Sequence, residues 1–191
     1  QTCALPISKA GEPRGEYYDA FTAGWEAPSS STTLTQGQGW IFHIATGETV
    51  KWTGNLNNGE ILVPITKGST GQNRGWNLIG NPYPAPIKWN DVHDLSSNVE
   101  DAFYIHVATG YYETGVWASY VNGIGVHKTD DVIAVGQGFF VRCTDTSGGT
   151  VRFTNSVRVR DYQNPSFYRE ESEKEGVLRL EIQNISEKLG E

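Results

Sequence analysis

The residues in this chain that could bind a metal are spread too widely to form a recognisable site. They are four histidines and two cysteines: His43, His93, His106, His127, Cys3 and Cys143. Zinc sites use closely spaced ligand pairs, and no two of these histidines lie within three to five residues of each other. The spacing predicts no zinc centre, and we expect His43 and His106 to be surface histidines.

Clusters of carboxylates are the next candidates for chemistry. They are Asp91 with Asp94, Asp130 with Asp131, and Glu170 with Glu171. Glycoside hydrolysis needs two carboxyl groups that face one bond, but these clusters occupy polar segments, where carboxylates are usually solvated. Asn90, Asp91 and Asp94 could offer oxygen ligands to a calcium ion, although they lack the ligand density of known calcium loops. We therefore expect that the chain is not an enzyme. The second alternative function is that it forms part of a glycoside hydrolase. Asp91 and Asp94 are weak candidates for binding calcium.

Aromatic rings offer a different chemistry, because the apolar C–H face of a sugar packs on a flat ring. The six tryptophans are Trp25, Trp40, Trp52, Trp76, Trp89 and Trp117. Among them, Trp40, Trp52 and Trp76 follow the alternation of predicted strands, so we expect them in the core. Trp89 and Trp117 lie in stretches that resemble loops, and they are the better candidates for ligand binding.

The proline-rich segment Gly80–Pro86 is the most distinctive stretch of the chain. Pro82, Pro84 and Pro86 fix the backbone angle φ and exclude a helix, which predicts a stiff, extended loop. Such a loop can serve as a corner of the scaffold or as the edge of a binding site. We favour the corner and keep Tyr83 as a tentative ligand-binding residue.

The composition indicates which elements must position these residues. The 191 residues include 22 glycines and 8 prolines, and 12% of them are aromatic, a balance that favours short strands joined by many turns. The formal net charge of −7 argues against nucleic acid or an anionic membrane as the main partner, because both need a basic surface. No apolar run reaches the roughly 18 residues of a membrane-spanning helix, so we expect no membrane insertion.

Two segments of the chain resemble each other. The first is Gly37–Ile44 followed by Thr49–Thr53, and the second is Gly136–Cys143 followed by Thr150–Thr154. Each is predicted to form a hairpin in which alternate residues share one apolar face. Each also opens with Gly-Gln-Gly, which favours a bulge or a tight crossover before the strand.

The alternation within these segments predicts which side chains are buried. Trp40 in the first segment, and Phe139, Val141 and Cys143 in the second, fall on the apolar faces. We expect the rings of Trp40 and Phe139 to interleave in a shared interior. Cys143 takes the place of an isoleucine in the other segment, so we expect a small buried hydrophobe and not a nucleophile.

Further strands are predicted from apolar alternation and from short apolar runs. They lie at Ile61–Ile65, Trp76–Ile79, Phe103–Val107 and Val132–Val135. The one predicted helix is a turn or two from Asn90 to Leu95. Short strands with frequent turns predict an all-β fold: an antiparallel β-sandwich, of jelly-roll or Ig-like type, with an internal hairpin repeat.

The ends of the chain set the expected domain boundaries. Residues 1–8 are predicted to be a non-native leader, residues 9–168 the β-sandwich domain, residues 169–176 a charged linker, and residues 177–191 the start of a following, truncated β unit. The linker assignment rests on a run of charges that ends in glycine.

Three motifs carry a resemblance to a known family. Gly75–Pro84 is similar to a signature of large bacterial surface proteins exported by the type IX secretion system. Gly136–Val141 resembles a later signature of the same region and Gly37–Trp40 an earlier one, and their order and spacing match between about Gly37 and Ile182. The resemblance implies an extracellular β-rich region upstream of a C-terminal sorting domain, and it carries no catalytic residues.

The predicted function is that of a non-enzymatic extracellular segment of a secreted or cell-surface protein, acting as a stalk, spacer or adhesion module. The first alternative is a carbohydrate-binding module that uses loop aromatics. The expected partner is a polysaccharide or another cell-surface component, and the expected location is extracellular or on the outer-membrane surface. The sequence leaves the ligand and the oligomeric state open.

Overall fold

The structure is a computed structural model. It describes the backbone of residues 4–6, 14–19, 24–26, 35–43, 55–68, 74–108, 115–127 and 129–160, and the side chains of residues 35–41, 55–68, 74–107, 115–127 and 129–160. Several predictions from the sequence fall outside these residues: the side chains of Cys3 and His43, the returning strand Thr49–Thr53, the linker 169–176 and the strand after it.

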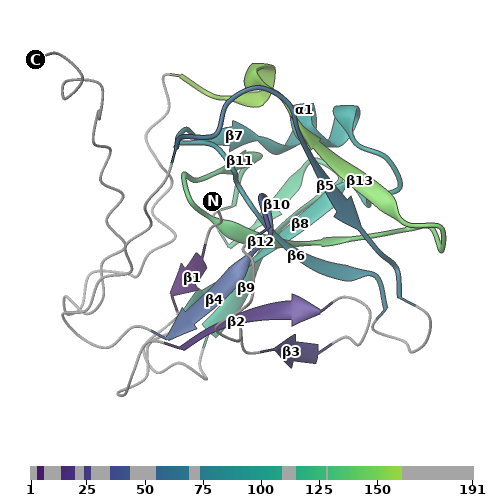
Figure 1. The fold of residues 1–191 in the computed structure, drawn as a ribbon. Coiled ribbons are helices and arrows are strands. Elements are labelled where there is room, and N and C mark those ends of the chain that lie inside the picture. Colours follow the sequence, from purple (N-terminus) through teal and green to yellow (C-terminus); the bar gives the residue numbers. More distant parts are fainter. Residues whose placement is uncertain are drawn as a thin grey trace, which may run out of the picture.

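The largest element is an antiparallel sheet of five strands, called the main sheet below (Figure 1). In spatial order its strands are β10 (Ile124–Val126), β9 (Gly115–Val121), β8 (Ala102–Ala108), β12 (Gly138–Arg142) and β6 (Trp76–Gly80). A tight turn at Asn122 and Gly123 joins β9 to β10, and both residues have positive φ, 47° and 84°. Asn-Gly favours this turn because both residue types tolerate the left-handed conformation.

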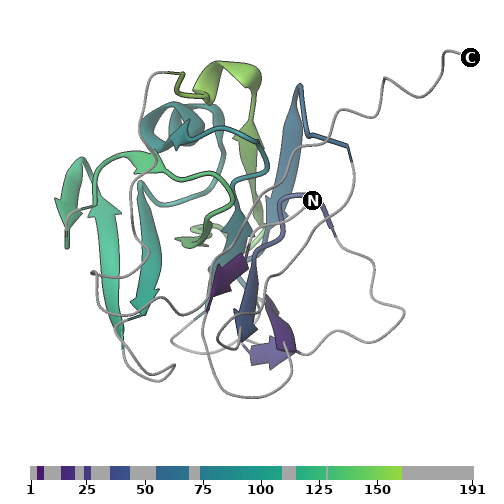
Figure 2. The same ribbon diagram turned by 90° about the vertical axis from the view of Figure 1, so that its left-hand side faces the viewer.

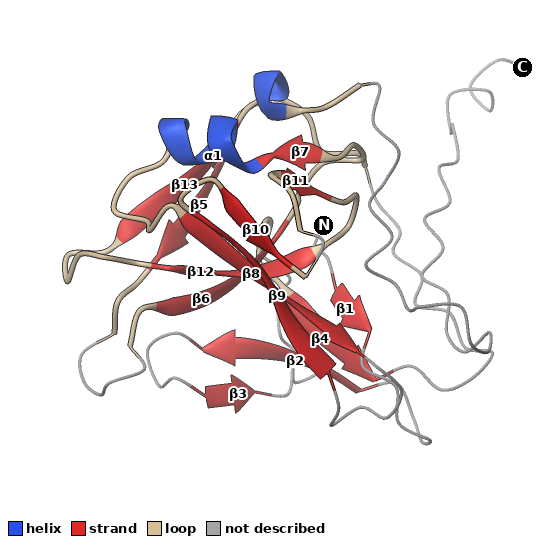
Figure 3. Ribbon diagram, turned by 180° about the vertical axis from the view of Figure 1, so that it is seen from behind, coloured by secondary structure: helices blue, strands red, loops and turns tan. Residues whose placement is uncertain are grey.

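A second, smaller group of elements covers the inner face of the main sheet. It contains the antiparallel pairs β5 (Ile61–Ile65) with β13 (Gly149–Phe153) and β7 (Ile87–Lys88) with β11 (Val132–Ile133), the helix α1 (Trp89–Leu95) and the 3₁₀ turn η1 (Asn155–Val157). In β5, Ile61, Val63 and Ile65 are buried while the residues between them are exposed. Figure 3 shows α1 close to the end of the β5–β13 ribbon.

The N-terminal strands form a separate sheet (Figure 2). Its order is β1 (Ala4–Pro6), β4 (Trp40–His43), β2 (Arg14–Asp19) and β3 (Gly24–Glu26), with β1 parallel to β4 and the other pairs antiparallel. The segment that leads into β4 also bonds to β6: Gly39 donates to the carbonyl of Leu78, and Gly80 donates to the carbonyl of Gly37.

One hydrophobic core joins the inner face of the main sheet to the ribbon and α1. Phe103, Ile105, Phe139 and Val141 come from the main sheet and are fully buried. Their counterparts belong to the same cluster: Ile61, Val63, Ile65, Val151 and Phe153 from the ribbon, and Trp89 and Val92 from α1. Burial of this apolar surface is the main source of stability of the fold.

Several predictions from the sequence are confirmed. The strands expected at Ile61–Ile65, Trp76–Ile79 and Phe103–Val107 are β5, β6 and β8, and the short helix is α1. Trp40, Phe139 and Cys143 are each no more than 1% exposed, as predicted, but the core cluster that contains Phe139 includes Ile41 and not Trp40, so the interleaving of Trp40 with Phe139 stays a prediction. The coarse fold class, mostly antiparallel β-structure with one short helix, is therefore correct.

The second predicted hairpin is wrong. β12 pairs with β6 and β8, whereas β13 pairs with β5, so consecutive strands enter different sheets. Alternation within a strand shows which residues share a face, but it does not show which strand is the neighbour.

The two Gly-Gln-Gly segments do share a turn. Gln38 donates to the carbonyl of Thr35, Gln137 donates to that of Ala134, and the third residue of each turn is a glycine with positive φ, 81° at Gly37 and 72° at Gly136. This conformation strongly favours glycine, which lacks a Cβ.

In the part of the chain that the structure describes, no helix is long and apolar enough to cross a membrane.

Candidate binding site on the main sheet

The strand register places a row of large side chains on the outer face of the main sheet, opposite to Phe103 and Phe139, and Phe140 of this row is itself part of the buried cluster. Tyr104 on β8 lies opposite Phe140 on β12, and His106 lies opposite Trp117 on β9. Arg142 on β12 lies opposite Trp76 on β6. Because residues two apart on a strand share a face, these side chains all project to the same side.

The rings of this row are in contact across four strands. We call Trp76, Tyr104, His106, Trp117 and Phe140 the aromatic face. The ring centroids of Trp76 and Tyr104 are 5.1 Å apart, and Phe140 lies 6.4 Å from Trp76 and 5.7 Å from Trp117. All these pairs meet edge to face, the favourable arrangement for the charge distribution of aromatic rings.

The aromatic face is partly open to solvent. Trp117 is 51% exposed, Trp76, Tyr104 and His106 are half-buried, and Phe140 in the centre is buried. On the neighbouring edge strand β10, Ile124 is 69% exposed and Val126 is 47% exposed, and the register puts both on this same side. The outer face of the main sheet is therefore an open apolar surface at Trp117 and along β10, whereas its centre at Phe140 is closed to solvent.

A paired charge lies at the Trp76 end of the row. Nη1 of Arg142 lies 3.2 Å from Oε1 of Glu100, and the guanidinium carbon lies 5.8 Å from the centre of the Trp76 ring. The side chains of Arg142 and Glu100 are 39% and 36% exposed. The ring and the carboxylate together hold the guanidinium group in place beside the aromatic face.

The ring of His106 lies between the Trp117 ring and Gly115 at the start of β9. Its ring centroid lies 5.2 Å from that of Trp117, and a Cβ on Gly115 would come within 2.4 Å of its Nε2 atom. Burial lowers the pKa of His106 below its ordinary value of 6.5, because partial loss of water disfavours the charged form. The prediction of a surface histidine is therefore only partly correct.

This pKa shift makes the stability of the fold depend on pH. Below pH 6.5 the His106 side chain is protonated in the unfolded chain but stays neutral in the folded chain until the pH reaches its lower folded pKa. The free energy of unfolding therefore falls as the pH drops from 6.5 to the folded pKa. Urea unfolding between about pH 8 and about pH 5 should show this loss, and His106→Gln should reduce it. Equal pH dependence in the two proteins would contradict the assignment.

Trp89 does not form part of a binding surface. It is the first residue of α1 and not a loop residue, and it is 0% exposed. Its ring packs against Phe103 and Phe139, and its indole nitrogen donates to Oδ1 of Asp101. A ring enclosed in this way cannot stack on a ligand, so the prediction for Trp89 is corrected.

Tyr83 is likewise buried, at 2% exposure, and the prediction that it binds a ligand is corrected. Arg158 lies 4.0 Å over its ring, Phe153 meets it edge to face, and its hydroxyl donates to the carbonyl of Gly59. Burial raises the pKa of Tyr83 above 10.0, against the opposing effect of Arg158. These contacts anchor the proline-rich segment to the rest of the fold at Tyr83.

The carboxylates take structural or solvent-exposed positions. Asp91 and Asp94 are exposed on α1 and not on a loop, and no cluster of three or more His, Cys, Asp or Glu residues in the described ranges could hold a metal ion. Asp131 accepts a hydrogen bond from Asn90 and pairs with Lys88.

Of the tentative ligand-binding residues, only Trp117 lies on an open surface, on β9 where a loop was expected. Sequence reasoning missed the companions of Trp117 on the aromatic face. The alternation of β8 did place Tyr104 and His106 on the face that points away from Phe103 and Ile105. It did not show that rings from other strands contact them on that face.

The fold and the aromatic face define the class: an antiparallel β protein with a shallow aromatic surface on its largest sheet. The chain belongs to a family described as a domain of unknown function (DUF8693), which matches residues 15–185. No curated protein and no solved structure matches the chain. The family description names no activity.

Proposed function

We propose that this chain is a non-catalytic module of a secreted or cell-surface protein and that it binds a saccharide chain on the aromatic face. The observation that carries the proposal is the contact row of Trp117, Phe140, Trp76 and Tyr104, with Trp117 half exposed. A pyranose ring buries its apolar C–H face on the exposed ring of Trp117 and leaves its hydroxyls to neighbouring polar groups. The sheet supplies the rings, in place of the loop aromatics expected from the sequence.

The same surface suits a chain-like ligand. Trp117 and the half-buried Trp76 lie on either side of the buried Phe140, 5.7 Å and 6.4 Å from it, so two separate rings are available to two units of one saccharide chain. A rigid antiparallel sheet fixes these rings in advance, which reduces the entropy lost on binding. The negative net charge of the chain disfavours polyanions as a class.

The wider context is part of this proposal. We propose that the module belongs to a surface protein exported by the type IX secretion system and that it is a β-sandwich of two layers. The resemblance of Gly75–Pro84 supports the first point. The core shared between the main sheet and the β5–β13 ribbon supports the second.

A purely adhesive contact is the second candidate function. Ile124 and Val126 on the edge strand β10 are exposed apolar side chains, and such residues are common where proteins meet other proteins. A stalk or spacer role needs no ligand and would leave the aromatic face unused.

Trp117→Ala tests the saccharide function directly. We expect the wild-type chain to be retarded in affinity electrophoresis through gels that contain neutral polysaccharides, and the variant to lose about tenfold or more in affinity because its exposed stacking platform is gone. Melting temperature should change little, since Trp117 is 51% exposed.

Leu62→Ala is the matched control, because Leu62 is 55% exposed on β5 in the ribbon. It should bind as the wild type does. If a broad panel of neutral and acidic polysaccharides leaves the wild-type mobility unchanged, the saccharide function is wrong and the stalk or adhesion roles take its place.

A further inference from the structure

We infer that the Glu100–Arg142 pair, together with Trp76, forms a subsite for two adjacent hydroxyls of a neutral sugar. The inference rests on the proposed saccharide function and adds a chemical class of ligand to it. It begins from the position of the pair beside a half-buried ring at one end of the aromatic face.

The pair is fixed from several sides. Arg142 bonds to Glu100 through Nη1, donates from Nε to the carbonyl of Arg74 at 3.5 Å, and stacks near Trp76. The backbone adds a further link, because the amide of Glu100 donates to the carbonyl of Arg142 at 2.9 Å. Two charged side chains held in this way lose little freedom when a ligand binds.

The pair keeps one donor and one acceptor available. Towards the residues that the structure describes, Nη2 of Arg142 and Oε2 of Glu100 make no hydrogen bond. A guanidinium nitrogen can only donate and a carboxylate oxygen can only accept. Two adjacent hydroxyls match this arrangement, since one can accept from Arg142 while the other donates to Glu100.

The charge of the site selects among saccharides. The positive and negative groups of the pair balance, so the subsite offers no free cation for a uronate or a sulfate ester. An anionic sugar would also meet the carboxylate of Glu100 and a chain of net charge −7. A neutral sugar forms charge-assisted hydrogen bonds here without either penalty.

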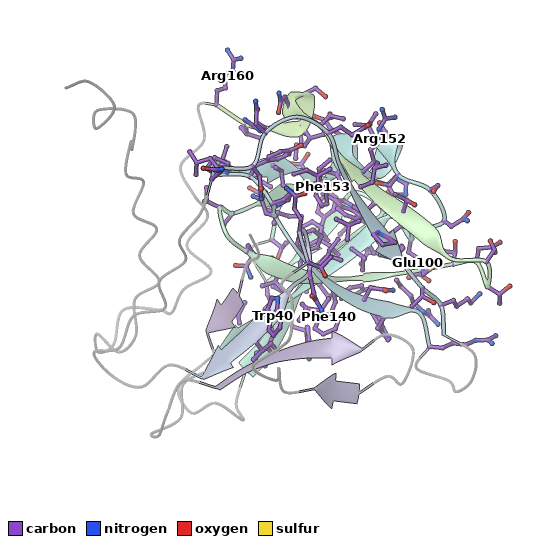
Figure 4. The ribbon with its side chains drawn as sticks, viewed as in Figure 1. Trp40, Glu100, Phe140, Arg152, Phe153 and Arg160 are labelled. Atoms are coloured by element: carbon purple, nitrogen blue, oxygen red, sulfur yellow. The ribbon has the colours of Figure 1, made fainter. Side chains whose placement is uncertain are left out.

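The structure also contains a matched control pair. Nη2 of Arg152 lies 2.6 Å from Oε1 of Glu60, with side chains 46% and 49% exposed, close to the exposure of the first pair. Arg152 lies in β13 and Glu60 directly precedes β5, so this second pair belongs to the ribbon and not to the aromatic face. Figure 4 labels Glu100, Phe140 and Arg152 and shows their separate positions.

The test compares three polysaccharides by calorimetric titration. Glucomannan is neutral, and its chain units keep two adjacent hydroxyls. Polygalacturonate keeps the hydroxyls but carries carboxylates, and laminarin is neutral but its linkage leaves no adjacent pair along the chain. We expect the wild-type chain to bind glucomannan about tenfold or more tightly than either of the others.

Variants assign this preference to the pair. Glu100→Gln should lower glucomannan affinity about tenfold, because the amide lacks the charge and presents a nitrogen on one side, whereas Glu60→Gln should leave affinity unchanged. Both variants should melt as the wild type does, since both side chains are partly exposed.

The outcomes separate the two proposals. If Trp117→Ala abolishes binding but laminarin or polygalacturonate binds as well as glucomannan, the diol subsite is wrong and the saccharide function stands. Equal glucomannan affinity in Glu100→Gln and the wild type would likewise show that the diol subsite is wrong, while the saccharide function stands. If the wild type binds none of the three but is retarded by another polysaccharide of the gel panel, the diol subsite alone is wrong, and if no polysaccharide of the panel retards it, the saccharide function itself fails.

Discussion

Trp89→Ala is expected to lower the free energy of unfolding by about 3–5 kcal/mol. Trp89 is 0% exposed and its ring touches Phe103 and Phe139, so the variant leaves a large cavity where α1 meets the main sheet. It also removes the hydrogen bond that the indole donates to Asp101. Because whole domains are stable by only about 5–15 kcal/mol, this loss approaches the limit of folding.

Urea unfolding followed by near-ultraviolet circular dichroism would measure the loss. Trp117→Ala serves as the matched control, because it removes the same side chain from a site that is 51% exposed. We expect the control to stay within about 1 kcal/mol of the wild type. If Trp89→Ala were as stable as the control, α1 would not hold Trp89 in the core.

Asn81→Ala is the second substitution with a large expected effect, a loss of about 2–5 kcal/mol. The Asn81 side chain is 1% exposed, and its amide nitrogen donates to the carbonyls of Ala85 and Ala134 at 2.8 and 2.9 Å. Its carbonyl oxygen accepts from the amide of Tyr83 at 3.0 Å. Alanine would leave buried backbone groups without these partners.

Asn58→Ala is the control for this experiment, because Asn58 is exposed and its side chain accepts a hydrogen bond from Arg158 at the surface. Thermal melts of the two variants should differ clearly, with a small shift for Asn58→Ala. A small shift for Asn81→Ala as well would show that water or rearrangement replaces the lost hydrogen bonds.

The sequence predicted the inward residues better than the connections between strands. In β5 the β-branched residues Ile61, Val63 and Ile65 recur at every second position, and in β8 Phe103 and Ile105 alternate with Tyr104 and His106, and in both strands this spacing identified the buried side chains. Period-two alternation reports burial directly, because it follows from the geometry of one strand. The pairing of β12 with β6, and not with β13, depends on contacts far apart in sequence.

The candidate site was harder to predict for a related reason. In β9, the neighbouring residues Val116 and Trp117 lie on opposite faces, and both are exposed. Because both faces carry apolar residues here, the segment lacks the alternation of apolar and polar residues that marks a strand. Trp89 was misassigned because the predicted helix began at Asn90, one residue too late, which left Trp89 in the preceding loop. The sequence therefore identified Trp117 as an exposed aromatic residue but not the rings beside it, and its binding of a ligand stays a prediction.

The placement of β6 has a consequence for how the chain acquires its fold. β6 is bonded on one edge to the segment at Gly37 and Gly39 and on the other to β12, which begins at Gly138. Neither neighbour is joined to it by a short turn, so its ladder closes only across long sequence separations. In an emerging polypeptide, the edge of β6 that faces β12 would stay unpaired until Gly138 and the residues after it become available. The β6–β12 pairing therefore forms only after most of the described residues have been synthesised.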